Sequence, residues 1–358
     1  MMNAHASLKA SEFLPTIPRR QWAPTTRQAV HCRRVIDETH DVKTFVLTSP
    51  MDRMFCFSAG QYVLVHLNMN GHAVTRSYSV SSPPTRPLDL QITVKRTPGG
   101  FVSNWLHDNL SVGDELEIEG PLGSFNLDDL QGERPLFLSG GSGITPVMSM
   151  LRALTDRADD RQIRFIHSAK TPADIIFRSE LDALAARFPN VQVTCVCSQA
   201  DIAWTGPSGR IDGEMLLSLV PDLHKRVVFA CGPEEYMKAA RACLDAIGLA
   251  PSQYHQESFG GSSPRVGLTS TISSSVRFVR SGISRICSTG ETLLDAARQS
   301  GVYVPTACQQ GVCGTCRIAK LSGEVAMDDL GGLTPEEKSA GYVLACCSRP
   351  KGAVLLDL

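Results

Sequence analysis

The sequence predicts a multidomain protein in which an antiparallel β-barrel precedes an α/β domain with a doubly wound parallel sheet and a smaller, cysteine-rich domain. Its 358 residues are too many for one ordinary hydrophobic core. Near residue 131 the pattern changes from short alternating segments to strands that alternate with helices. A stretch rich in Gly and Ser, residues 259–273, is typical of a flexible linker and precedes the third segment, residues 274–358.

The composition excludes several classes of protein. Hydrophobic residues make up 42% and charged residues 20%, as in a globular protein. A formal net charge of -1 argues against a nucleic-acid partner held by general electrostatics. No apolar run approaches the roughly 18 residues that a membrane span needs. Residues 1–28 lack the apolar core of a signal peptide, and we expect them to form a loose extension of a monomeric protein.

Residues 29–130 carry the predicted barrel, because their apolar and polar residues alternate in short segments separated by Gly and Pro. The segments are DVKTFVLTSP, GQYVLVHLNM, AVTRSYSVSS, LDLQITVKR and DELEIEGPLG. Within RSYS, Arg76 and Tyr78 share one face of a strand. The arginine could pair with a phosphate while the tyrosine stacks on a planar ring. A half-buried aromatic in an ordinary strand is the alternative.

A glycine turn follows the next strand. Gly99 and Gly100 precede a predicted helix, FVSNWLHDNL, whose first N–H groups around residues 101–103 are free to bind an anion. A glycine turn before a helix is weak evidence by itself. Its position one strand after RSYS strengthens the prediction of an anion site.

Residues 131–258 alternate strands with helices, which predicts a parallel, doubly wound sheet. The turn SGGSGITP follows the strand PLFL and opens a helix with Pro146 in its first turn, the geometry that suits a dinucleotide pyrophosphate. It departs from the usual G-x-G-x-x-G order, so a tight structural turn is the alternative. ACGP places Cys231 at the carboxyl end of another strand, where such sheets bind ligands, although a lone cysteine there is more often a small buried hydrophobe.

The loop ACQQGVCGTC carries the most specific pattern. Cys308, Cys313 and Cys316, with Cys346 further on, have the spacing of a plant-type [2Fe–2S] site. Zinc is the main rival, but it usually requires two close cysteine pairs, and the adjacent Cys346 and Cys347 cannot easily share one tetrahedral ion. Twelve cysteines without an export signal indicate a reducing, cytoplasmic location and argue against disulfides. We assign Cys346 as the fourth ligand.

The cysteine-rich segment resembles plant-type ferredoxins along its whole length, which implies an α+β fold of the β-grasp type. Together with RSYS, GGFVS, GGSGITP and ACGP in this order, it resembles the ferredoxin–NADP reductase superfamily fused to a ferredoxin. The residues that this resemblance implies for the flavin are Arg76, Ser77, Tyr78, Ser79, Val94, Lys95, Gly100, Phe101, Val102 and Ser103. Those implied for the nicotinamide nucleotide are Gly140, Gly141, Gly143, Thr145, Pro146, Cys231, Gly232 and Pro233. Those implied for hydride transfer are Ser79, Cys231 and Glu257; for Glu257, a surface carboxylate is the alternative.

The resemblance implies electron transfer from NADH through FAD and the [2Fe–2S] cluster to a partner that accepts single electrons. That partner is expected to be the terminal oxygenase of a Rieske-type monooxygenase or demethylase. The hybrid-cluster protein, or a redox-sensing module without a dedicated oxygenase, is the alternative. A flavohaem arrangement within this chain is excluded, because the sequence has no helical haem domain.

Two finer expectations concern the cofactors. The second anion site near the glycine turn favours FAD over FMN. NADH is favoured over NADPH because Asp174, four residues after Lys170, would repel a 2′-phosphate. Arg178 is expected a turn into its helix, exposed to solvent or paired with Asp182.

Overall fold

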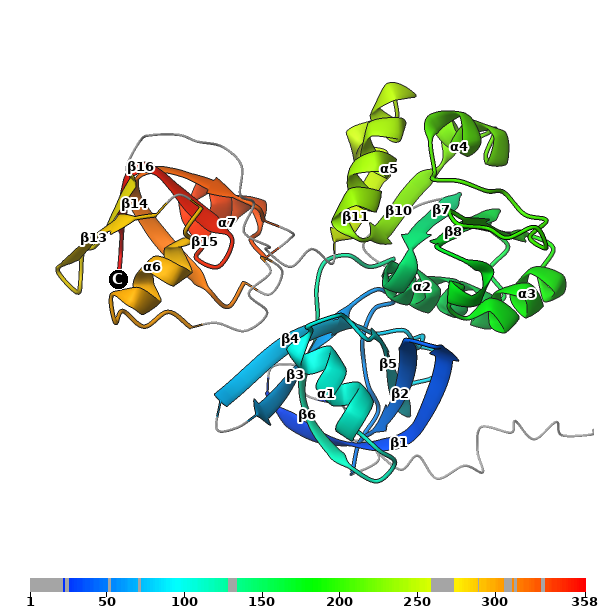
Figure 1. The fold of residues 1–358 in the computed structure, drawn as a ribbon, viewed down its shortest axis with the longest axis horizontal. Helices are drawn as coiled ribbons and strands as arrows, with labels where there is room; N and C mark the ends of the chain where they lie inside the picture. Colours follow the sequence, from blue (N-terminus) through cyan, green and yellow to red (C-terminus); the bar gives the residue numbers. More distant parts are fainter. Residues whose placement is uncertain are drawn as a thin grey trace, which may run out of the picture.

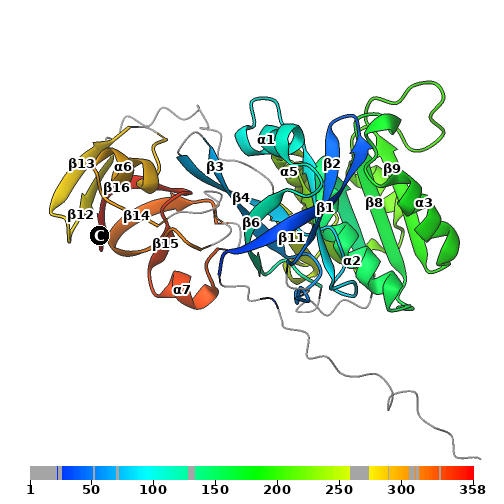
Figure 2. The same ribbon diagram turned by 90° about the horizontal axis from the view of Figure 1, so that it is seen from below.

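The computed structural model forms three bodies in chain order (Figures 1 and 2). It describes residues 22, 26–50, 53–69, 72–127, 134–258, 274–288, 290–305, 311, 314–329 and 332–358. The predicted linker, residues 259–273, lies outside the described residues. None of the helices within these ranges is long and apolar enough to cross a membrane.

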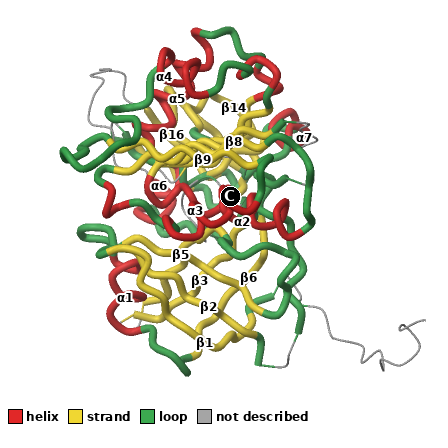
Figure 3. Tube along the Cα trace, turned by 90° about the vertical axis from the view of Figure 1, so that its right-hand side faces the viewer, coloured by secondary structure: helices red, strands yellow, loops and turns green. Residues whose placement is uncertain are grey.

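The first body is the expected antiparallel barrel. Its strands are β1 (Gln28–Thr39), β2 (Val42–Thr48), β3 (Tyr62–Met69), β4 (His72–Ser79), β5 (Asp89–Lys95) and β6 (Glu115–Leu122). Their order is β4-β3-β6-β1-β2-β5, and a bridge between Val80 and Ile92 joins the two edge strands. Helix α1 (Phe101–Asn109) lies beside the barrel strands (Figure 3). Its Val102 and Leu106 are buried in the barrel core.

Strand β1 was not among the predicted segments. Its pairing with β2 shifts register between Cys32 and Arg34, so a bulge interrupts the alternation on which the prediction depended. The N-terminal extension is also less loose than expected. Trp22 is 3% exposed, its ring lies 4.9 Å from that of Phe55, and its Nε1 donates to the Gly120 carbonyl at 2.7 Å. The extension is therefore anchored to the barrel at this residue.

The second body is the expected doubly wound α/β domain. Its parallel strands are β7 (Pro135–Gly140), β8 (Ile163–Ala169), β9 (Val191–Cys197), β10 (Val227–Gly232) and β11 (Tyr254–Ser258), in the order β11-β10-β7-β8-β9. Its helices are α2 (Ile144–Asp156), α3 (Arg178–Arg187), α4 (Gly213–Leu219) and α5 (Glu234–Ala246). Phe137, Phe165 and Phe229 pack on the side of α2 and α3. Leu136, Leu138 and Val228 pack on the side of α4 and α5, so successive residues of each strand enter opposite layers. Figure 1 shows α2 and α3 on one face of the sheet and α4 and α5 on the other.

The third body has the predicted β-grasp architecture. Its elements are β12 (Ser274–Phe278), β13 (Ile283–Cys287), α6 (Leu293–Gln299), β14 (Arg317–Met327), α7 (Pro335–Ser339), β15 (Tyr342–Leu344) and β16 (Ser348–Leu356). The strand order is β13-β12-β16-β14-β15, with β12 parallel to β16 and the other pairs antiparallel. Helix α6 buries Leu293, Leu294 and Ala297 against this sheet.

Helix α2 holds the barrel and the α/β domain together. Ser149 Oγ donates to the Ser82 carbonyl and Arg152 Nη1 to the Ser81 carbonyl, both at 2.7 Å. At the end of the helix, the Arg86 guanidinium binds both carboxylate oxygens of Asp156. Because both carbonyls directly follow β4, this contact positions the end of the RSYS strand against the sheet of the second domain.

Candidate active site

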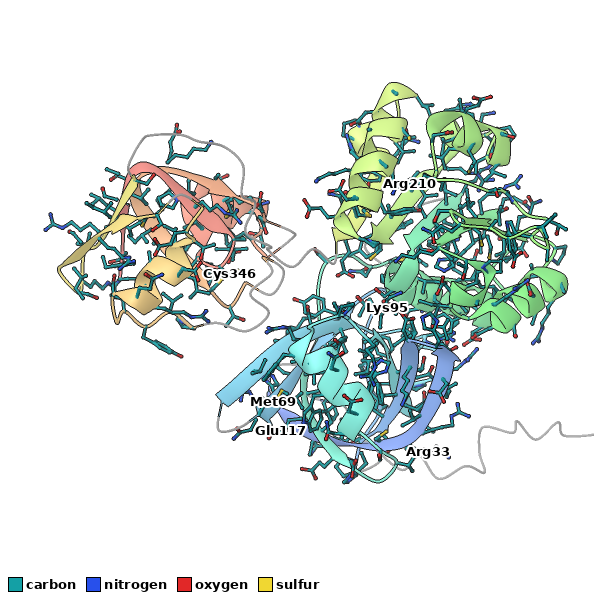
Figure 4. All side chains as sticks on the ribbon, in the orientation of Figure 1. Arg33, Met69, Lys95, Glu117, Arg210 and Cys346 are labelled. Carbon is teal, nitrogen blue, oxygen red and sulfur yellow. The ribbon has the colours of Figure 1, made fainter. Side chains whose placement is uncertain are left out.

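A cavity of about 350 Å³ lies where the barrel meets the α/β domain. Twelve of the residues that line it were implied from the sequence, and four were not. The twelve are Arg76, Ser77, Tyr78, Ser79, Val94, Lys95, Gly100, Phe101, Val102, Ser103, Thr145 and Glu257. The four are Tyr62, Thr93, Thr97 and Ser142. Figure 4 shows Lys95 at the boundary between the two bodies.

The RSYS strand supplies one wall of the cavity. Burial raises the pKa of the Tyr78 phenol above its usual value, which keeps this side chain neutral even at alkaline pH. Arg76 is two residues away on the same strand face, and its guanidinium donates to the Thr75 carbonyl at 2.8 Å. A planar aromatic ring and a cation therefore line the cavity together, and they fit a flavin that carries phosphate.

The predicted glycine turn supplies a second wall. Gly99 has a φ of 69°, and a Cβ on Gly100 would come within 2.5 Å of Ser103 Oγ. Gly100 is the N-cap of α1 and has no side chain to bind the first-turn N–H groups. Lys95 lines the same cavity as Gly100, and its Nζ lies 3.0 Å from the Asp41 carboxylate. The free N–H groups suit a phosphate, as the sequence predicted.

Ser79, Cys231 and Glu257 meet at the floor of the junction. Ser79 Oγ donates to Glu257 Oε2 at 2.8 Å, and Glu257 pairs with Cys231 in the register of β10 and β11. Burial raises the pKa of the Glu257 carboxyl from 4.5 to about 7, and the hydrogen bond from Ser79 opposes this shift. Burial also raises the pKa of the Cys231 thiol. The surface position considered for Glu257 is wrong, because this side chain is 6% exposed.

The turn after β7 brings a helix N-terminus close to β10. A Cβ on Gly143 would lie 2.3 Å from the Cys231 carbonyl oxygen and 2.5 Å from the Gly232 Cα. Gly143 also caps α2, again with no side chain to bind the first N–H groups. Gly140 and Gly232 both pack against the ring of Tyr236, a contact that the sequence motifs did not reveal. This packing buries Gly140, Gly143 and Gly232, whereas Gly141 and Ser142 of the turn stay partly exposed. A pyrophosphate can approach the backbone there, as a nicotinamide dinucleotide requires.

The preference for NADH over NADPH was predicted from the positions of Asp174 and Arg178, and both residues have contacts that the sequence did not reveal. Asp174 caps the turn at Thr171 and lies 3.6 Å from His40, so its carboxylate has partners within the protein. Arg178 is the first residue of α3 instead of lying a turn inside it, because Phe177 before it adopts a left-handed φ of 58°. The Arg178 side chain is exposed, which is one of the two positions expected for it, and its guanidinium lies 5.7 Å from the ring of Trp204.

The candidate cluster site lies in the third body. Cys308 and Cys313 are outside the described residues, whereas Cys316 and Cys346 are 3% and 4% exposed. The Cys346 thiol contacts both Cys316 and Cys347 through hydrogen bonds (Figure 4 labels Cys346). The contact between Cys316 and Cys346 fits two thiolate ligands of one cluster.

Two glycines shape the loop around these thiols. Gly311 and Gly314 have φ values of 74° and 71°. A Cβ on Gly311 would lie 2.8 Å from the Asp328 carbonyl, and one on Gly314 would lie 2.7 Å from the Gly332 carbonyl. Both positions therefore require glycine, as the sequence pattern indicated, although the close neighbours in the structure are backbone carbonyls.

The fold and the three sites define an oxidoreductase with a flavin domain, a nicotinamide nucleotide domain and an iron–sulfur domain. Family comparisons agree: an oxidoreductase FAD-binding domain matches residues 31–127, an oxidoreductase NAD-binding domain matches 137–242, and a 2Fe-2S iron-sulfur cluster binding domain matches 278–351. The chain belongs to the ferredoxin–NADP reductase superfamily, among the members that carry a C-terminal 2Fe-2S domain.

Similar proteins share this organisation over their whole length. The glycine betaine monooxygenase reductase subunit of Pseudomonas aeruginosa is 42% identical over 97% of this chain and 100% of its own. The stachydrine N-demethylase reductase subunit of Rhizobium meliloti is 36% identical over 92% and 96%. Among solved structures, phthalate dioxygenase reductase is 27% identical, with a TM-score of 0.63 over 93% of this chain and 98% of its own.

The chain is thus an NADH-dependent reductase that carries electrons from NADH through FAD to a [2Fe–2S] cluster, as the sequence predicted. When bound, FAD takes up two electrons as a hydride and releases them singly to the cluster. The barrel strands and α1 line the flavin cavity. Helix α2 closes it from the side of the nucleotide domain, where Ser142 and Thr145 reach the same cavity. Residues of both domains therefore line this cavity.

Proposed function

We propose that this reductase supplies electrons to the terminal oxygenase of a Rieske-type monooxygenase that demethylates a quaternary amine. The supporting observation is its full-length similarity to two reductase subunits whose names specify glycine betaine monooxygenase and stachydrine N-demethylase. Both relatives match this chain across all three domains, including the domain that delivers the electron. The partner is then an oxygenase with its own iron–sulfur centre and a substrate that carries N-methyl groups.

Within this proposal, the residues of the cavity have separate roles. Tyr78 stacks on the isoalloxazine ring, while Arg76 and the first turn of α1 hold the phosphates of FAD. The turn at Gly143 receives the pyrophosphate of NADH. Ser79 and Glu257 sit where the nicotinamide meets the flavin, and their hydrogen bond orients the serine hydroxyl. Cys308, Cys313, Cys316 and Cys346 hold the cluster.

A second candidate partner has its own support. The NADH oxidoreductase HCR of Escherichia coli is 33% identical over 95% of this chain and 99% of its own. Its similarity also covers all three domains, so domain order does not separate the two candidates. The higher identity to the glycine betaine reductases favours the oxygenase.

Reconstitution tests the choice of partner. The purified reductase, NADH and glycine betaine are combined with a purified terminal oxygenase of the Rieske type, and formaldehyde is measured. We expect formaldehyde to form in proportion to the NADH consumed, and to be lost when the reductase carries Cys346→Ser. Rapid reduction of purified hybrid-cluster protein, with no formaldehyde from any quaternary amine, would instead select the second candidate.

A further inference from the structure

Three buried hydroxyl groups form a row along the face of the barrel that packs against the nucleotide domain. Ser81, Thr93 and Thr44 are 0%, 5% and 1% exposed. Ser81 Oγ lies 2.8 Å from Thr93 Oγ1, which lies 2.8 Å from Thr44 Oγ1. Thr44 Oγ1 in turn donates to Glu38 Oε1 at 2.7 Å. All three distances are those of good O–H···O hydrogen bonds, so the row is continuous.

This row connects two separate cavities. Thr93 lines the flavin cavity. Glu38 lines a second cavity of about 530 Å³ on the same domain boundary. The second cavity reaches the surface, because its lining residue Asp37 has a side chain that is 80% exposed. The hydroxyls of Thr93 and Thr44 therefore link a residue that lines the flavin cavity to a carboxyl group that lines the second cavity.

The direction of the hydrogen bonds follows from counting hydrogens. Each hydroxyl has one hydrogen to donate and two lone pairs that accept. Thr44 uses its hydrogen on Glu38, so it must accept from Thr93. Thr93 then has no hydrogen left for the flavin cavity and presents an acceptor lone pair instead. A proton taken up by Thr93 is thus passed on by successive hydrogen transfers that end at Glu38.

Glu38 is suited to receive such a proton. It is half-buried, and burial raises the pKa of its carboxyl above the usual value, while the hydrogen bond from Thr44 and the charge of Arg152 oppose this. Other charged groups also face the second cavity: Arg34 and Asp37 from β1, Arg86 from the loop before β5, and Arg178 and Glu180 from α3. Glu180 binds Arg152 in a bidentate pair, so much of the positive charge of Arg152 is already matched.

The reaction of a reductase of this class requires a proton exit. NADH gives the flavin a hydride, which is one proton and two electrons, and NAD⁺ leaves. With FAD and the cluster bound, the two electrons would leave one at a time through the cluster, and one proton per NADH would be left in the cavity. One proton per NADH must therefore leave a cavity that both domains enclose.

We propose that Thr93, Thr44 and Glu38 conduct this proton from the flavin cavity to the second cavity, where Glu38 releases it to solvent. The inference rests on the reductase function. The pair formed by Ser79 and Glu257 is a different route, but Glu257 is 6% exposed and lines the flavin cavity itself. A proton on Glu257 has therefore not yet left the cavity, whereas a proton on Glu38 has.

The test separates hydride transfer from proton release in the intact holoenzyme. NADH first reduces the flavin under anaerobic conditions, and ferricyanide then reoxidises it in a weakly buffered solution with a pH indicator. Glu38→Gln keeps the acceptor oxygen for Thr44 but cannot take a proton, and Thr44→Val interrupts the row. Two variants serve as controls: Thr44→Ser retains the hydroxyl, and Asp37→Asn changes a carboxylate that lines the same cavity outside the row.

We expect all variants to be reduced by NADH at the wild-type rate, since hydride transfer needs no proton exit. Proton release, and with it flavin reoxidation, should slow about tenfold or more in Glu38→Gln and Thr44→Val, with an increased solvent isotope effect, and should be normal in both controls. If Glu38→Gln and Thr44→Val release protons as fast as Asp37→Asn does, the proposal is overturned. A further variant, Glu257→Gln, is compared for proton release alone, and slowed release in it with normal release in Glu38→Gln and Thr44→Val would also overturn the proposal. Failure of NADH to reduce the wild-type flavin would instead refute the reductase function.

Infrared titration provides a readout independent of turnover. The C=O band of a protonated carboxyl group should grow in the wild type as the pH falls, and its Glu38 component should be missing in Glu38→Gln. In Thr44→Val the band should shift, because the hydroxyl no longer donates to the carboxyl, and Thr44→Ser should restore it. An unchanged band in Thr44→Val would show that the row does not reach Glu38.

Discussion

Replacing Glu257 with Gln should stabilise the flavin-free chain at alkaline pH. Burial raises the pKa of this carboxyl from 4.5 to about 7 in the folded state. One pKa unit corresponds to about 1.4 kcal/mol, so the shift corresponds to a loss of about 3 kcal/mol of folding stability when the group ionises. Gln removes the charge and retains an oxygen that accepts the hydrogen bond from Ser79.

The sign of the effect follows from proton binding. Between about pH 4.5 and about pH 7 the folded chain binds a proton at Glu257 more tightly than the unfolded chain does, so stability falls as the pH rises through this window. Below it both states are protonated and the group has no differential effect. Above about pH 7 the full loss of stability is present. The free energy of unfolding of Glu257→Gln should then exceed that of the wild type by about 3 kcal/mol.

Urea unfolding near pH 5 and near pH 8, followed by tryptophan fluorescence, measures this difference. The control is Glu115→Gln, which changes an exposed carboxylate on strand β6 of the barrel and should leave the pH dependence as in the wild type. Parallel pH profiles for the wild type and Glu257→Gln would refute the reasoning, because they would mean that the buried carboxyl ionises without loss of stability.

Four further predictions concern the other sites. Gly143→Ala should lower the free energy of unfolding by about 3 kcal/mol, because its Cβ meets backbone at 2.3 Å, whereas Gly213→Ala meets nothing within 4 Å and should be neutral or slightly stabilising in the same urea titration. Cys346→Ser should remove the [2Fe–2S] absorption bands and cytochrome c reduction while ferricyanide reduction by the flavin persists; loss of the bands in Cys347→Ser alone would reverse the assignment. NADH should exceed NADPH in kcat/KM, and a tenfold preference for NADPH, about 1.4 kcal/mol, would show that Arg178 leaves the Trp204 ring to clamp a 2′-phosphate. Flavin released by acid should have the mass of FAD, and recovery of FMN alone would contradict the second phosphate site at α1.

Sequence reasoning was most reliable where local chemistry dictates structure. The alternating segments of the barrel and the strand–helix alternation of the second domain reflect which face each residue buries, so periodicity revealed them. It failed at β1, where a bulge breaks the alternation, and at the start of α3, where Phe177 adopts a left-handed conformation. Neither feature has a signal in a single sequence, because both depend on neighbours that are distant along the chain.

The residues that line the cavity likewise fall into those that local motifs revealed and those that only strand pairing brings together. The motifs RSYS, GGFVS and GGSGITP identified most of its lining, because glycine turns and helix N-termini are encoded within a few residues. Tyr62 and Thr93 were missed. They lie on β3 and β5 with no motif of their own, and they face the cavity only because those strands pair beside β4 and β2.

By itself, the sequence determined the three domains, the spacing of the cluster cysteines and the glycine turns, since each depends on residues close together in the chain. Only the tertiary structure decided that Glu257 is buried against Ser79, 178 residues away, and that Thr44 and Thr93, 49 residues apart, bond to each other. Both contacts arise where separate strands and domains pack together. Burial there excludes water from the carboxyl and aligns the hydroxyls, and neither effect exists until the chain has folded.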